Sequence, residues 1–143
     1  MRGVAASTLV VLAACTSDLP DLSRDDAGAC AELTAALPDR VAGEDIIDDT
    51  DRAARWGGIE LTCGVGVPAA YDDFADCTVV GDVGWFLPPA ELKDAGVDIV
   101  ATALTWSPRV SVLIPAEHRG SDEVLAAIAP AITSTLTEGK PCL

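Results

Sequence analysis

Alternating apolar and polar residues mark two stretches of the chain as β-strands with one buried face. In residues 59–65 the apolar side chains stand at every odd position. In residues 109–114 the inward set is Val110, Val112 and Ile114. Side chains of a strand point alternately to opposite faces, so each pattern predicts one face packed on a core.

Shorter apolar runs separated by turn residues predict further strands. Residues 78–80 and 83–86 flank Gly81-Asp82, a pair that favours a hairpin turn. Residues 99–106 lead into the strand at 109–114 through Ser107-Pro108, which predicts a second hairpin.

Helical spacing appears near both ends of the chain. Cys30, Leu33 and Leu37 share one helix face, and Pro38 ends that helix. A second apolar stripe is interrupted by Pro130, which predicts a kink or two consecutive helices; its residues are Leu125, Ile128, Ile132 and Leu136. The pattern predicts an α+β fold, with an antiparallel sheet of about four to five strands. We expect the N- and C-terminal helices to pack on one face of this sheet.

The first residues have the pattern of an export signal. A short basic start and an apolar run end in Leu12-Ala13-Ala14-Cys15, which resembles the bacterial lipobox. The resemblance implies cleavage after residue 14, lipid on Cys15 and anchoring in the cell membrane at its extracytoplasmic face. An ordinary secretory signal is the alternative. Residues 15–28 would then be the lipidated cysteine and a flexible tether, and residues 29–143 a single α+β domain.

Charge narrows the range of partners. The 143 residues include 9 basic and 23 acidic side chains, a net charge of −14. Such a surface does not favour binding to nucleic acid or to anionic headgroups, because both need basic side chains. The composition indicates an acidic, self-repelling surface.

The four cysteines other than Cys15 predict two disulfides, as expected in an exported chain. Three pairings are possible, and we favour Cys63–Cys77 and Cys30–Cys142. The first would close a local loop, and the second nearly the whole domain. No C-x-x-C pair is present, so the sequence predicts neither a metal site nor a redox motif.

Residues 39–54 are predicted to form a loop with a crowd of carboxylates between Glu44 and Asp51. A calcium site is one interpretation and a solvated acidic loop the other, but the spacing does not match an EF-hand. His118 is the only histidine, and no nucleophile motif accompanies it. We therefore expect no catalytic residues and no cofactor.

The three tryptophans are the remaining candidates for binding. Trp56 and Trp85 are expected in a core that has few other aromatic residues. Trp106 stands beside the Ser107-Pro108 turn, so it is expected to be exposed and, with Arg109, to form a contact surface.

Several short motifs follow one order along the chain: Cys30…Leu33…Leu37-Pro38, Trp56-Gly57…Cys63-Gly64-Val65, Cys77, Gly84-Trp85 and Val110…Val112…Ile114-Pro115. In this order the chain resembles the actinobacterial envelope lipoprotein family catalogued as domain of unknown function 3515. The chain departs from the family pattern at two places, which are Gly57-Gly58 directly after the tryptophan and the residues that directly precede Arg109. The resemblance implies a location but no activity.

The sequence therefore predicts a non-enzymatic, membrane-anchored lipoprotein that binds an envelope protein or a cell-wall component. An envelope hydrolase that uses acidic residues and a cation-dependent binding module are the alternatives.

Overall fold

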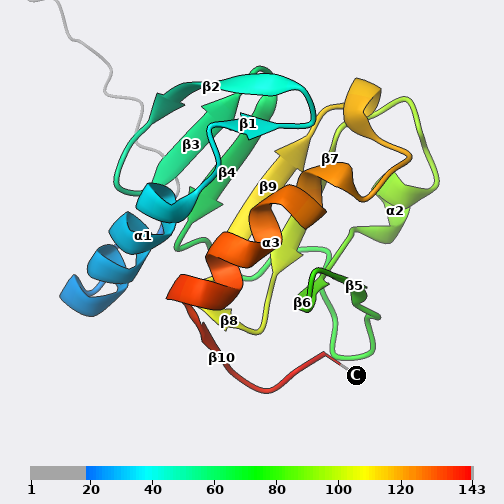
Figure 1. Ribbon diagram of the computed structural model, residues 1–143. Coiled ribbons are helices and arrows are strands. Elements are labelled where there is room, and N and C mark those ends of the chain that lie inside the picture. The colour runs from blue at the N-terminus through cyan, green and yellow to red at the C-terminus, as the bar shows by residue number, and fades with distance from the viewer. Residues whose placement is uncertain (1–18, 143) are drawn as a thin grey trace, which may run out of the picture.

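The computed structural model describes residues 19–142 and has the predicted α+β fold (Figure 1). One antiparallel sheet has six strands in the order β1-β2-β3-β4-β9-β7, and two small sheets pair β5 with β6 and β8 with β10. The elements are α1 (Arg24–Ala36), β1 (Arg40–Val41), β2 (Glu44–Asp49), β3 (Ala53–Trp56), β4 (Ile59–Cys63), β5 (Thr78–Val80), β6 (Val83–Trp85), α2 (Pro89–Leu92), β7 (Ile99–Ala103), β8 (Trp106–Ser107), β9 (Val110–Ile114), η1 (Ala116–His118), α3 (Glu123–Thr135) and β10 (Thr137–Glu138).

Both predicted strands with a buried face lie in the middle of the large sheet. The alternation in β4 and β9 is confirmed: their residues are buried at every second position, and Leu61 pairs with Val112. The β5–β6 hairpin turns at Gly81 and Asp82, which both adopt positive φ, as a two-residue hairpin turn of this kind requires. Trp56 and Trp85 are fully buried, as expected.

Helices α1 and α3 contact each other on one face of the sheet (Figure 1). The predicted apolar faces of both helices are buried. Of the two predicted effects of Pro130, a kink or two consecutive helices, the second is wrong, because α3 continues through Pro130 as one helix. Proline cannot donate to the carbonyl of Ala126, but both residues are exposed, so water can reach that carbonyl.

The acidic stretch predicted as a loop is instead part of the sheet. Residues 44–49 form β2, which pairs with β3 through a bulge between Ile46 and Asp48. Beyond its short pairing with β1, β2 is an edge strand, and most of its side chains are exposed. Charged residues are common on edge strands because they oppose pairing with other chains. Strand β2, together with β1 and β3, brings the large sheet to six strands, whereas β5 and β6 form a separate small sheet.

The predicted disulfide pairing is wrong, although two disulfides are present. Cys30 in α1 bonds to Cys63 at the end of β4, and Cys77 bonds to Cys142. Neither Cys63–Cys77 nor Cys30–Cys142 forms. The buried side of β4 faces the layer that holds α1, so Cys63 meets Cys30 rather than its neighbour in sequence.

The predicted tether is also too long, because α1 already begins at Arg24. Ser23 caps this helix, and its side-chain oxygen accepts a hydrogen bond from the Asp26 amide at 3.1 Å. The predicted signal peptide and Cys15 lie outside the described residues. Within residues 19–142, no helix is long and apolar enough to cross a membrane.

Candidate functional site

A cavity of about 490 Å³ lies where the N-terminal segment meets the β7–β9 connection. We call it the Trp106 cavity, and it brings together the two residues that the sequence predicts as a contact surface, Trp106 and Arg109. Its walls come from four separate parts of the chain: Pro20, Asp21, Leu22 and Asp26, then Gly64, Val65 and Gly66, then residues 104–109, and finally Lys140.

One wall of the cavity is held in place by Arg52. Its Nε donates to the Cys63 carbonyl at 2.9 Å, and its Nη2 donates to the carbonyls of Gly64 at 2.9 Å and Pro20 at 2.7 Å. Gly64 has a φ of +78°, and a Cβ there would collide with the side chain of Leu22. The segment at Pro20–Leu22 is therefore fixed against the end of β4.

Trp106 is buried, with 6% of its surface exposed, so the prediction of an exposed tryptophan is wrong. Trp106 belongs to the hydrophobic core, and β10 pairs with its strand, β8, with Glu138 opposite Trp106. Trp106 Nε1 is buried and has no hydrogen-bond partner in the described part of the chain. A buried donor without a partner lowers the stability of a fold by about 1–3 kcal/mol. Trp106 is also one of the residues that line the cavity.

Arg109 and Lys140 are the basic side chains of this cavity. Among residues 19–142, neither makes a side-chain hydrogen bond or ion pair with the protein. Four other arginines of this region are engaged with carbonyls or carboxylates: Arg40, Arg52, Arg55 and Arg119. The cavity thus has two uncommitted positive charges in a chain of net charge −14.

The backbone around Arg109 is already committed. Its carbonyl accepts hydrogen bonds from the amides of Gly64 at 2.7 Å and Val65 at 3.2 Å. These amides are therefore not available to bind an anion in the manner of an oxyanion hole. An anion beside Arg109 would therefore meet its guanidinium group and not these two amides.

His118 lies elsewhere, on the second cavity, of about 360 Å³, which it lines together with Ser121. Its Nε2 is 3.5 Å from Glu44 Oε1, and its side chain is 18% exposed. Between residues 19 and 142, no hydrogen bond joins His118 to a serine or threonine hydroxyl. The neighbouring Arg119 donates to the carbonyls of Glu91, Asp94 and Val97, which fixes the loop between α2 and β7.

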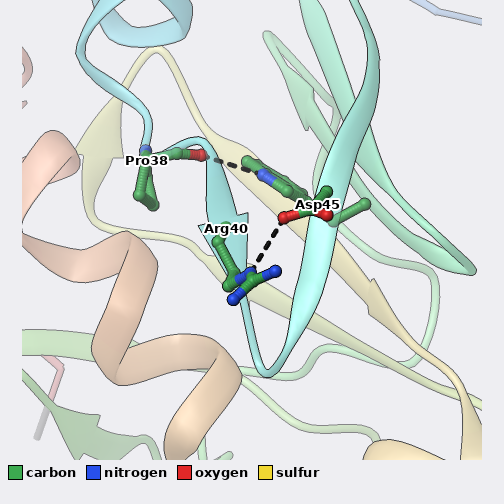
Figure 2. Close-up of polar contacts among 4 residues, drawn as sticks. Pro38, Arg40 and Asp45 are labelled. Carbon is green, nitrogen blue, oxygen red and sulfur yellow. Dashed lines mark hydrogen bonds and ion pairs between the residues drawn. The ribbon is translucent and has the colours of Figure 1, made fainter.

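The acidic residues of β2 lie at the edge of the large sheet, where one of them pairs with an arginine of β1. Arg40 Nε donates to Asp45 Oδ1 at 2.8 Å, between β1 and β2 (Figure 2). This hydrogen bond and the charge of Arg40 hold the pKa of Asp45 below its ordinary value. The Pro38 carbonyl nearby accepts a hydrogen bond from Trp56 Nε1 at 2.9 Å (Figure 2). No group of three or more potential metal ligands lies within residues 19–142.

Several residues of the Trp106 cavity were not predicted from the sequence. Lys140 and Asp26 line the cavity and Arg52 holds its wall, but these residues lie far apart in the chain and none belongs to a motif. For Lys140 and Arg52, the available signal was the scarcity of basic residues, which makes each basic residue a candidate for a specific contact.

Comparison with known families gives one match. The family model described as "Protein of unknown function (DUF3515)" matches residues 7–141, nearly the whole chain. No curated protein and no solved structure matches.

Proposed function

The chain belongs to the DUF3515 family of proteins of unknown function, and we propose that it is a lipid-anchored binding module of the bacterial cell envelope. In this proposal it does not catalyse a reaction but binds an envelope protein or wall component. The observation that carries the proposal is the Trp106 cavity, which unites Trp106, Arg109 and Lys140 beside the first described residues of the chain.

The position of the cavity relative to the proposed anchor supports this role. Pro20, in the cavity wall, is five residues from Cys15. Five residues span at most about 18 Å even when fully extended. Lipid on Cys15 would therefore hold the cavity close to the membrane surface, where its ligand would be presented.

The chemistry of the cavity supports binding rather than catalysis. The titratable side chains that line it are Asp21, Asp26, Arg109 and Lys140. His118 lines a different cavity, so the histidine and the Trp106 cavity do not form one site. A tryptophan and an arginine in a concave surface are typical of binding energy concentrated in a few residues.

The anchor is tested by labelling cells with a radioactive fatty acid. We expect label on the protein and its recovery with membranes, and loss of both in Cys15→Ser. An unlabelled protein recovered from the culture medium would contradict the proposal.

The binding site is tested by photo-crosslinking in the same cells. A photoreactive residue replaces the exposed Ser107 at the cavity, and a control replaces Ile47 on β2, which is 65% exposed. We expect a discrete product from position 107 and none from position 47. Identical products from both positions would contradict a specific site in the cavity.

A further inference from the structure

We infer that the Trp106 cavity binds a small polyol that carries one anionic group, such as a uronic acid or glycerol phosphate. This inference rests on the proposed function and names the chemical class of its ligand. The charges that line the cavity and the size of the space carry this inference.

The basic side chains indicate an anionic group. Arg109 and Lys140 line the same cavity and have no protein partner within residues 19–142. A guanidinium binds a carboxylate or phosphate through two parallel hydrogen bonds, and a lysine adds a point charge. The cavity balances two acidic side chains with two basic ones, whereas the chain as a whole has a net charge of −14, so an anion is repelled less here than at the rest of the surface.

The acidic side chains indicate that the ligand also carries hydroxyl groups. Asp21 and Asp26 line the N-terminal part of the wall and would repel a second negative charge. Ionised carboxylates only accept hydrogen bonds, so their natural partners here are hydroxyl donors. One anionic group with several hydroxyls satisfies both parts of the wall.

Trp106 contributes apolar surface to the wall of the cavity. Its Nε1 is buried, so a ligand would meet the indole ring and not the N–H group. Aromatic side chains supply a large contact area at binding sites. The cavity volume of about 490 Å³ is within the range of small-molecule sites, about 300–1,000 Å³.

The test is calorimetric titration of the acylated full-length mature protein in phosphatidylcholine nanodiscs. The ligands are glucuronate, glycerol phosphate, glucose and inorganic phosphate. We expect saturable binding of glucuronate or glycerol phosphate, and at least about tenfold weaker binding of glucose, which lacks the charge, and of phosphate, which lacks the polyol. Tighter binding of glucuronate identifies the anionic group as a carboxylate, and tighter binding of glycerol phosphate identifies it as a phosphate.

Variants connect binding to the cavity. Arg109→Gln and Lys140→Gln should each weaken binding about tenfold. Lys93→Gln is the matched control, because Lys93 is exposed and lies outside the cavity. Melting curves show whether each variant is folded, and Lys140, which is exposed near the C-terminus, can be changed with little effect on folding.

The outcomes separate this inference from the proposed function. Absence of binding, binding unchanged in Arg109→Gln and Lys140→Gln, or equal binding of inorganic phosphate would overturn the inference. If crosslinking at position 107 still captures a protein, the proposed function stands and its ligand is a different one. If neither experiment detects a ligand at the cavity, both fail.

Discussion

Replacing Arg52 with methionine tests how firmly the N-terminal segment is held to the domain. The change keeps the apolar stem but removes three hydrogen bonds, to the carbonyls of Pro20, Cys63 and Gly64. Two of these bonds are partly buried and one is exposed. At about 1 kcal/mol of net stability for each bond, with the exposed one at the lower end, the free energy of unfolding should fall by about 2–3 kcal/mol.

The assay is urea unfolding of the full chain, followed by circular dichroism. A loss of this size lowers the midpoint by about 1–2 M. Hydrogen exchange should accelerate at the amides of residues 21–26, because the segment loses its attachment to β4. Arg40→Met is the matched control, since Arg40 binds only the exposed Asp45 and should change the midpoint little. If Arg52→Met lowers stability no more than the control, the segment is not held by Arg52 and the reasoning fails.

Three further predictions concern the indole groups, the edge of the sheet and the disulfides. Trp56→Phe should destabilise the protein by about 1 kcal/mol more than Trp106→Phe in urea unfolding, because only Trp56 loses a hydrogen bond; equal losses would contradict this. Since the folded-state pKa of Asp45 is lowered, its stabilising contribution should be present at neutral pH and lost as pH falls through that pKa. The melting difference between wild type and Asp45→Asn should therefore disappear in acid, and a difference that persists there would refute the assignment. Tryptic digestion without reduction should release one disulfide-linked product made of peptides 25–40, 56–93 and 120–143. A product that links 25–40 to 120–143 without 56–93 would contradict the observed pairing.

The elements that the sequence predicts correctly are those with a strong local pattern. Strands β4 and β9 alternate apolar and polar residues, and the stripes of α1 and α3 repeat at helical spacing. Strand β2 has no such pattern, because it lies at an edge and most of its side chains meet water. Four of its six residues carry carboxylates, so the strand lacks the buried apolar face by which strands are predicted from sequence.

Contacts between distant segments account for the incorrect predictions. Cys63 bonds to Cys30, which lies 33 residues earlier in helix α1. The sequence alone does not show that this helix faces the end of β4. Trp106 joins the hydrophobic core in the folded chain, where β10, a strand of two residues near the C-terminus, pairs with its strand. The sequence identifies Trp106 and Arg109 as a pair, but Lys140 and Asp26 join them only through the tertiary fold.

The connectivity of the disulfides has a consequence for how the chain matures. The loops closed by Cys30–Cys63 and Cys77–Cys142 follow one another without overlap. A chain that emerges from its N-terminal end presents both cysteines of the first pair before either cysteine of the second. With Cys15 lipidated, as proposed, oxidation of the other four cysteines in order of appearance yields the native pairs without later exchange between them. In the predicted pairing, by contrast, the Cys30–Cys142 loop would enclose the Cys63–Cys77 loop. Cys30 would then remain a free thiol until nearly the last residue had emerged.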